Sequence, residues 1–255
     1  MKAKTFGFIG GGRITRIFLQ AFQNKGFMPL KVVVTDINSE TTAALKQEFP
    51  HIEISGPEAA SGQEIVLIAL HPPAIIETLE KIKEFIQPGV CVISLAPKID
   101  IEKISGKLNG LKNVARLIPS ATSVINEGYN PICFSEDFKE KQSIIKWLSL
   151  LGKTFEVDEP KLEAYAIISA MLPTYFWFQW RELLQIGVKI GLNENECMEA
   201  VEESLIASVH TMFTSGLSYE EVVDLIPVKP IGNHEPVIKD IFSVNLVSLY
   251  DKIKP

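Results

Sequence analysis

Three consecutive glycines near the N-terminus are the first residues whose type and spacing indicate chemistry. They follow a short apolar run typical of a strand and open a segment with helical spacing; the loop comprises Gly10, Gly11, Gly12, Arg13 and Ile14. Such a loop lets the backbone approach a pyrophosphate, and the free N–H groups and positive dipole end of the following helix attract the anion. We therefore predict that this loop binds a dinucleotide; a purely structural turn is the alternative.

A carboxylate further along the chain supports a nucleotide site. Asp36 ends the β-branched run 30–36, at the place where an acidic side chain binds the ribose hydroxyls of NAD and repels the 2′-phosphate of NADP. The sequence thus favours NAD, within a prediction of NAD or NADP. Thr35 and Asn38, with Arg13 nearby, are alternative phosphate ligands, and a surface aspartate that merely ends a strand is the other interpretation of Asp36.

The elements that would position these residues alternate between strand and helix. Residues 64–70 and 89–96 are almost continuously apolar, as strands buried on both faces of a sheet are. After Asp158 only helical patterns follow. This pattern predicts an α/β fold: a Rossmann-type, mostly parallel sheet in a dinucleotide-binding domain over 1–158, then an all-helical domain over 159–255.

Composition narrows the class of protein. The 255 residues are 46% hydrophobic and 22% charged, which excludes intrinsic disorder. With 25 Lys and Arg against 31 Asp and Glu, the net charge is −6, so we expect no nucleic-acid partner. Cys91, Cys133 and Cys197 lie far apart, without the close spacing of a metal site. We expect buried thiols, no metal and a cytoplasmic protein.

One uncharged segment, 164–180, is 17 residues long and at the lower limit for a membrane span. It contains Pro173 and Gln179, and a helix buried on all sides in a core or a dimer explains it better. The N-terminus also lacks the apolar stretch of a signal peptide, because glycines interrupt it. We expect no membrane partner and a homodimer formed through the helical domain.

Several motifs resemble the pyrroline-5-carboxylate reductase family over nearly the whole chain. They are Phe8 to Gly12 for its F-I-G-x-G, Ala69-Leu70-His71-Pro72 for A-V-K-P, Arg116-Leu117-Ile118-Pro119 for R-x-M-P, Pro173-Thr174-Tyr175-Phe176 for P-A-Y-F, and Gly187 to Leu192 for A-G-V-x-L-G-L. The resemblance implies a Rossmann domain, a helical domain that interlocks with a partner chain, and reduction of pyrroline-5-carboxylate to proline with NAD(P)H. It also adds Ala69, Leu70, His71 and Pro72 to the expected cofactor contacts.

The chain departs from the family where the substrate would bind. Residues 169–172 read SAML in place of S-G-S-G, and 229–234 read KPIGNH in place of S-P-G-G-T-T. Ser120 also stands where the family has asparagine after R-x-M-P. These differences leave the substrate open.

Four residues of the C-terminal half are candidates for catalysis. Lys229 would pair with a substrate carboxylate, and His234 would give a proton to an imine nitrogen, with Asn233 beside it. Tyr175 is a candidate only through its place in the P-A-Y-F motif. An interhelical turn with an exposed histidine is the alternative for His234. His71, at the carboxyl end of a strand, is expected to touch cofactor or substrate, or else to be an ordinary loop residue.

Together these features predict an NAD(P)H-dependent oxidoreductase that transfers a hydride to a small imine carboxylate, as in proline biosynthesis. One alternative is a dehydrogenase of another small carboxylate, similar to the hydroxyisobutyrate family, although that class places a lysine on the long helix and 164–180 has none. The other is a regulatory protein that binds a nucleotide without catalysis.

Overall fold

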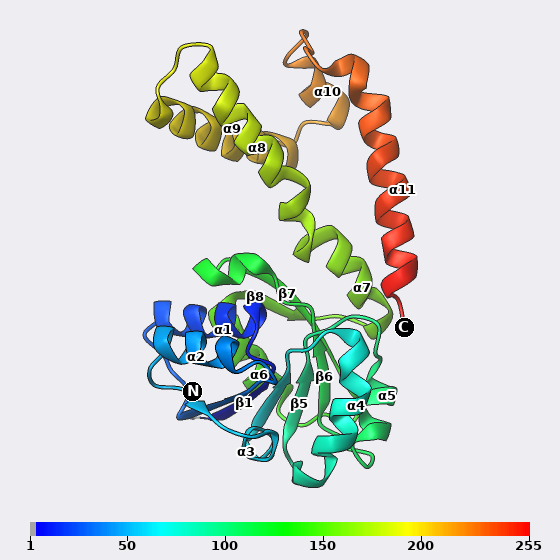
Figure 1. Cartoon of the computed structure of the whole chain (residues 1–255). Helices are drawn as coiled ribbons and strands as arrows, with labels where there is room; N and C mark the ends of the chain where they lie inside the picture. The colour runs from blue at the N-terminus through cyan, green and yellow to red at the C-terminus, as the bar shows by residue number, and fades with distance from the viewer. Residues whose placement is uncertain (1–3) are drawn as a thin grey trace. The chain divides into compact units, whose positions relative to one another are not determined.

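The computed structural model describes residues 4–255 and divides into two compact units. The first unit is the chain up to Met171 together with Leu249–Pro255, and the second unit is Leu172–Ser248 (Figure 1). The boundary expected after residue 158 lies earlier than this division. Leu162 and Ala166 explain the difference, because both are buried in the core of the first unit.

Eight strands form one sheet in the first unit. They are β1 (Thr5–Ile9), β2 (Lys31–Thr35), β3 (Glu53–Ile54), β4 (Ile65–Ile68), β5 (Cys91–Ser94), β6 (Val114–Leu117), β7 (Gly128–Phe134) and β8 (Gly152–Glu156). Their order is β3-β2-β1-β4-β5-β6-β7-β8, and every neighbouring pair is parallel except β6 and β7. The order of the first six is that of dinucleotide-binding domains, which confirms the predicted Rossmann-type sheet.

Helices cover both faces of this sheet (Figure 1). The α-helices between the strands are α1 (Arg13–Asn24), α2 (Ser39–Glu48), α3 (Pro57–Ser61), α4 (Pro72–Ile82), α5 (Ile101–Lys107) and α6 (Lys141–Leu148). Single 3₁₀ turns are η1 (Lys83–Phe85), η2 (Ala121–Ile125), η3 (Ser149–Leu151) and η4 (Glu159–Lys161). Side chains of α1, α2 and α6 share one core and those of α3, α4 and α5 the other. Within β2, Val32 and Val34 join the first core and Val33 the second, which explains why the strand is apolar throughout.

The predicted helix over 164–180 is interrupted. It consists of α7 (Leu162–Tyr165), a π-helical turn (Ala166–Ala170) and the start of α8 (Leu172–Lys189). Within this chain it is not buried on all sides, because Trp177 and Phe178 of α8 are 48% and 67% exposed. No helix in the described part of the chain is both long and apolar enough to cross a membrane.

The second unit is helical, as the sequence predicted. After α8 it contains α9 (Glu194–Thr214), α10 (Tyr219–Asp224), the turn η6 (Gly232–His234) and most of α11 (Glu235–Ile253). Reciprocal side-chain caps start α9 at Asn193 and α10 at Ser218. Gly187 lets α8 approach α9 closely, since a Cβ there would lie 2.6 Å from Sγ of Cys197.

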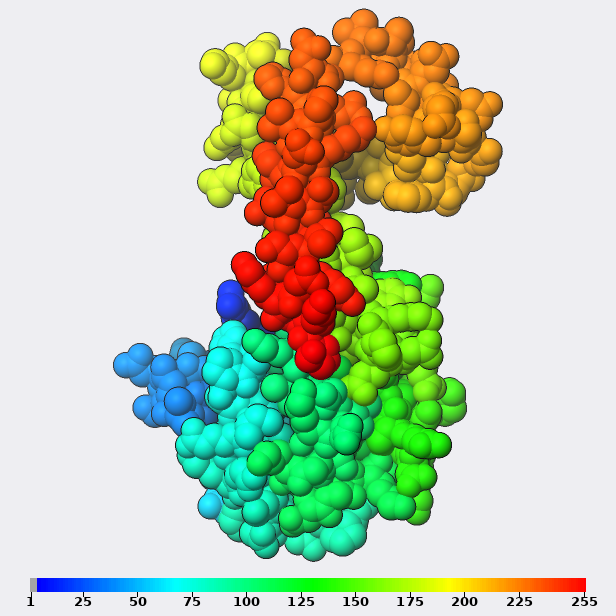
Figure 2. Space-filling model, turned by 90° about the vertical axis from the view of Figure 1, so that its right-hand side faces the viewer, coloured from blue at the N-terminus to red at the C-terminus, as the bar shows by residue number. Residues whose placement is uncertain are grey.

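The second unit has almost no interior of its own. Of residues 172–248, only Pro173 and Cys197 are buried. The helix α11 stands uncovered on the face that Figure 2 turns to the viewer, and its Val244 and Val247 are 66% and 60% exposed.

Candidate active site

The glycine loop is built around one residue that must be glycine. Gly10 has a φ of +109°, and a Cβ there would lie 2.4 Å from the carbonyl oxygen of Ala69. The loop thus crosses the end of β4 at a distance that only glycine permits. Thr15, where glycine or alanine is usual, fits because its buried hydroxyl donates to the carbonyl of Gly10 at 2.6 Å.

Gly12 is different, because nothing in the protein requires a glycine there. Its φ is −74°, a Cβ would meet no atom within 4 Å, and it precedes the first turn of α1. That turn has no side-chain cap and no acidic residue, so its N–H groups and positive dipole end are open to an anion. A pyrophosphate drawn to this helix end would lie where a side chain at position 12 would project, so the loop fits a dinucleotide.

Asp36 is held directly beside this loop. Its Oδ2 accepts the backbone N–H of Gly11 at 2.7 Å, and its Oδ1 accepts that of Asn38 at 2.8 Å. The side-chain oxygen of Asn38, an alternative phosphate ligand, caps α2 by accepting from Glu40 and Thr41. The structure therefore places a fixed, half-buried carboxylate at the end of β2.

A cleft of about 460 Å³ opens at the carboxyl ends of the strands, and we call it the strand-end cleft. Its lining is Gly12, Arg13, Ile14, Ala69, Leu70, His71, Pro72, Leu95, Ala96, Pro97, Ile118, Pro119, Ala166 and Met171. No carboxylate lines the cleft, whereas Arg13 brings a positive charge to it, although the chain as a whole is acidic. It lies beside the point where the sheet order reverses, the usual ligand site of open α/β sheets.

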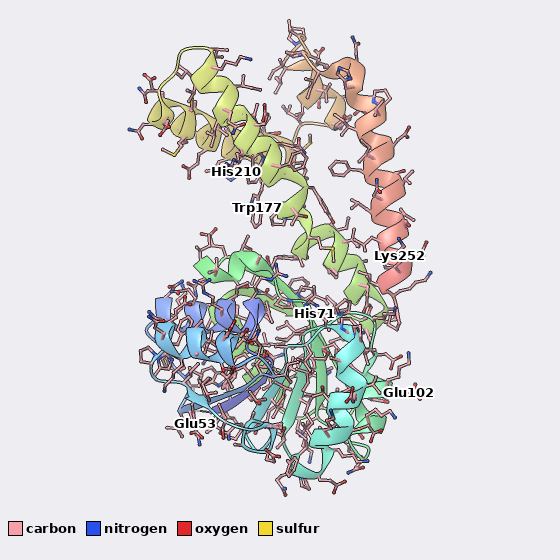
Figure 3. All side chains as sticks on the ribbon, viewed as in Figure 1. Glu53, His71, Glu102, Trp177, His210 and Lys252 are labelled. Carbon is pink, nitrogen blue, oxygen red and sulfur yellow. The ribbon has the colours of Figure 1, made fainter. Side chains whose placement is uncertain are left out.

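Seven of the predicted cofactor residues thus come together in this cleft, from two loops far apart in the sequence. His71 is exposed and precedes the first turn of α4, where Figure 3 labels it. The lining residues that the sequence analysis missed follow β5 and β6, or are Ala166 of the π-helical turn and Met171 directly after it. The sequence offered a signal for two of them: the apolar run 89–96 ends at Ala96, and Ile118 belongs to the motif Arg116-Leu117-Ile118-Pro119.

Arg116, near the end of β6, forms an ion cluster with Glu159 and Glu163, which we call the Arg116 cluster; Arg116 and Glu163 are buried and Glu159 is partly exposed. Nη1 of Arg116 pairs with Oε1 of Glu159 at 2.9 Å, and Nη2 pairs with Oε1 of Glu163. Burial opposes the charge on Arg116, but the carboxylates of Glu163 and Glu159 outweigh it and raise the pKa of the guanidinium.

The two carboxylates of the Arg116 cluster also hold backbone near the cleft. Glu159 accepts the N–H of Ile101 at 2.8 Å, and Glu163 accepts that of Lys98 at 3.2 Å. The cluster therefore ties β6 to the loop after β5 and to α7. The sequence showed Arg116 only as part of a motif, without this role.

The remaining candidates lie in the second unit. Lys229, Asn233 and His234 fall within one tight turn, in which the carbonyls of Lys229 and Ile231 accept the N–H groups of Gly232 and His234. Tyr175 lies on α8, with its ring 5.8 Å from that of Phe242, and burial raises its pKa.

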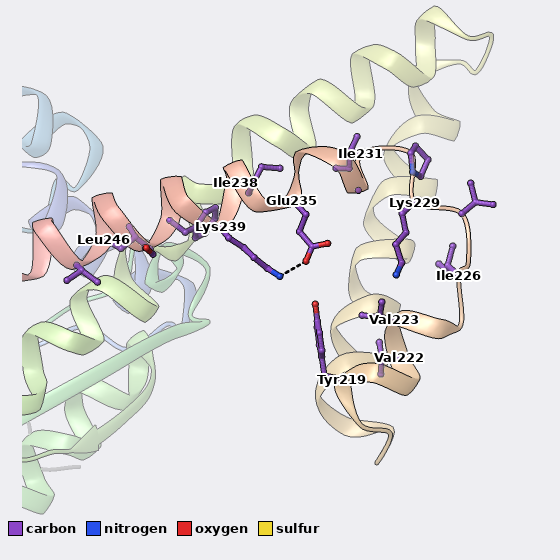
Figure 4. A pocket seen from close by; sticks show the side chains of 16 residues that line it. Tyr219, Val222, Val223, Ile226, Lys229, Ile231, Glu235, Ile238, Lys239 and Leu246 are labelled. Carbon is purple, nitrogen blue, oxygen red and sulfur yellow. Dashed lines mark ion pairs between the residues drawn. The ribbon is translucent and has the colours of Figure 1, made fainter.

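Lys229 borders a wide groove of about 1060 Å³ between α10 and α11, the α10–α11 groove (Figure 4). Most of its lining is apolar, including Val222, Ile226 and Ile238, and its charged pair is Glu235 with Lys239 at 2.6 Å. His234 is exposed and is not part of this lining.

No three or more His, Cys, Asp or Glu side chains within residues 4–255 are arranged to hold a metal ion. All three cysteines are free and buried. Burial raises the pKa of the Cys133 thiol to about 12, which makes it unreactive near neutral pH.

Comparisons with known proteins agree with this geometry. The family model described as NADP oxidoreductase, coenzyme F420-dependent, matches residues 5–98, from β1 through β5. A pyrroline-5-carboxylate reductase of Haemophilus influenzae is 24% identical and covers 82% of this chain and 78% of its own. The pyrroline-5-carboxylate reductase of Staphylococcus aureus is 22% identical, and the match covers 96% of this chain and 92% of the Staphylococcus protein.

The chain resembles the pyrroline-5-carboxylate reductases. The structure of the reductase from Streptococcus pyogenes superposes with a TM-score of 0.83 at 18% identity, covering 100% of this chain and 99% of the other. The structure of the Plasmodium falciparum enzyme, determined with NADP bound, superposes with a TM-score of 0.80 at 19% identity. The superposition covers 99% of this chain and 96% of the other. The resemblance to the pyrroline-5-carboxylate reductases predicted from the motifs is confirmed, as is the fold, which both units share with these enzymes.

Proposed function

We propose that the protein is an NAD(P)H-dependent reductase that transfers a hydride to a small imine carboxylate, with pyrroline-5-carboxylate as the first candidate. The strand-end cleft carries this proposal, because it joins a glycine loop open to a pyrophosphate with apolar walls beside it. The similarity to the pyrroline-5-carboxylate reductases along nearly the whole chain supports it.

The chain's own residues would bind, orient and exclude water. The backbone of Gly12 and the first turn of α1 would hold the pyrophosphate, and Asp36 would accept the ribose hydroxyls. When bound, the reduced nicotinamide supplies a hydride to the imine carbon. Leu70, Ala96 and Ile118 would keep water from the reacting centre.

The imine nitrogen gains a proton as the carbon gains the hydride. We propose His234 as its donor, with His71 at the rim of the cleft as the alternative. Lys229, Asn233 and Tyr175 are proposed as further substrate contacts from the second unit. The backbone N–H of His234 donates to the carbonyl of Ile231 at 2.9 Å, which fixes the backbone from which the imidazole extends.

For the cofactor we propose a preference for NAD over NADP. The carboxylate of Asp36 would face the 2′-phosphate of NADP, and like charges at close range are repelled. We also propose the cytoplasm as its compartment, since free, buried thiols suit a reducing environment.

We further propose a homodimer formed through the second unit. Large apolar side chains there are strongly exposed in the single chain, among them Phe213 at 79% and Val228 at 72%. The α10–α11 groove adds a concave apolar surface. A monomer seldom exposes so many large apolar side chains, and a second copy would cover them.

Turnover of Δ1-pyrroline-5-carboxylate, followed by oxidation of NADH, tests the activity. Gly12→Val is the matched control, because it should lose the cofactor while keeping the fold. His234→Ala should lower kcat/KM roughly 100-fold with unchanged affinity for NADH, and His71→Ala should do so instead if His71 is the donor. Binding of NADH without reduction of any imine or keto carboxylate would contradict the proposal and support the non-catalytic alternative.

A further inference from the structure

Lys98 has a backbone conformation that a lysine rarely adopts. Its φ is +80°, in the left-handed region that favours glycine. The other non-glycine residues with positive φ in the described chain are Asn109, Asn126 and Glu140. None of these lies next to a residue of the strand-end cleft, whereas Lys98 directly follows Pro97, which lines it.

The Arg116 cluster holds Lys98 in this conformation. The backbone N–H of Lys98 donates to Glu163, which is 1% exposed and paired with the fully buried Arg116. Three residues on, the N–H of Ile101 donates to Glu159 of the same cluster. A strained residue persists only where its surroundings impose the strain, and such residues concentrate at functional sites.

The side chain of Lys98 is exposed and makes no ion pair with any residue from 4 to 255. The adjoining cleft has no carboxylate in its lining. An ammonium on a flexible stem at this place is therefore available to an anion.

The order of the strands indicates which anion this is. Asp36 at the end of β2 marks the adenosine side, and Gly12 at the junction of β1 and β4 marks the pyrophosphate. The ends of β5 and β6 lie on the opposite side of that junction, so they border the reactive end of a bound dinucleotide. Lys98 follows β5 and thus lies at the substrate end.

We propose that Lys98 binds the carboxylate of the substrate and selects anionic imines. This inference rests on the proposed reductase function and adds to it a specificity-determining residue in the first unit. The ammonium would form a charge-assisted hydrogen bond with the carboxylate, while the Arg116 cluster fixes the backbone from which it extends.

The test compares two substrates that differ by one carboxylate group, Δ1-pyrroline-5-carboxylate and Δ1-pyrroline. Lys98→Asn removes the ammonium but keeps a residue that tolerates positive φ. We expect it to lower kcat/KM for the carboxylate roughly 10- to 100-fold, to spare Δ1-pyrroline, and to leave the affinity for NADH alone unchanged. Lys146→Asn, on the exposed side of α6, is the matched control and should change neither substrate.

Lys98→Gly provides a readout that a purely structural role would not give. Because glycine adopts this φ without strain, the variant should melt a few degrees higher than the wild type. Its kcat/KM for the carboxylate substrate should nevertheless fall as much as that of Lys98→Asn.

If Lys98→Asn affects both substrates equally, or affects neither, the inference is overturned. It is also overturned if Lys229→Asn, and not Lys98→Asn, shows the loss specific to the carboxylate substrate. A wild type that binds NADH but reduces neither imine would instead refute the reductase function itself, and this inference with it.

Discussion

The carboxylate of Asp36 and the backbone N–H of Gly11 are joined by a hydrogen bond of 2.7 Å. This bond links the residue that would choose between the two cofactors to the loop that would hold their common pyrophosphate. A change at Asp36 can therefore act on selectivity through its charge and on affinity through the loop.

Asp36→Asn should largely separate these two effects, because the amide oxygen can still accept from Gly11 while the charge and the bond from Asn38 are lost. We expect the wild type to bind NADH several-fold more tightly than NADPH, and the variant to bind both about equally. Fluorescence titration of each cofactor measures this. A wild type that prefers NADPH would contradict it and direct attention to Arg13.

Gly10 and Gly12 should respond differently to the same substitution. Gly12→Val should keep a melting temperature close to that of the wild type, because its φ is negative and no protein atom lies within 4 Å of the new Cβ. It should nevertheless lose NADH binding, since the side chain would displace the pyrophosphate.

Gly10→Val is the companion variant and should be clearly destabilised, by its φ of +109° and by contact with the carbonyl of Ala69. Calorimetric melting and cofactor titration of both variants make the comparison. A soluble Gly12→Val protein with unchanged affinity would refute the pyrophosphate site.

Arg116→Met should lower the free energy of unfolding by about 3–5 kcal/mol, because it leaves the buried carboxylate of Glu163 without its partner. Urea denaturation measures the loss. Adding Glu163→Gln should recover part of it by removing the unpaired charge.

The control for this prediction is Lys112→Met, which breaks an exposed pair with Asp137 at 2.9 Å. Exposed pairs are worth less than about 1 kcal/mol, so the change should be small. Equal losses in the Arg116 and Lys112 variants would show that the buried cluster has no special role.

Phe213→Asp should weaken the proposed dimer without unfolding the chain, because this side chain is 79% exposed in the single chain and its replacement removes little internal packing. Sedimentation at low micromolar concentration should show a dimer for the wild type and a larger monomer fraction for the variant. A wild type that sediments as a fully active monomer would be incompatible with the dimer.

The local features of the first unit could be predicted from the sequence, because each depends on neighbouring residues. Apolar runs mark strands buried on both faces, as Val32, Val33 and Val34 do by alternating between the two cores. A glycine loop between strand and helix marks an anion site because only glycine permits the turn at Gly10.

The sequence by itself thus determined the class of fold, the glycine loop with Asp36, and the resemblance to the pyrroline-5-carboxylate reductases. Only the tertiary structure decided the rest of the cleft and the Arg116 cluster, whose partners Glu159 and Glu163 are 43 and 47 residues away in the chain. The physical reason is that sheet order, not local pattern, brings distant residues together, and that a lysine held at positive φ has no signature in the sequence around it.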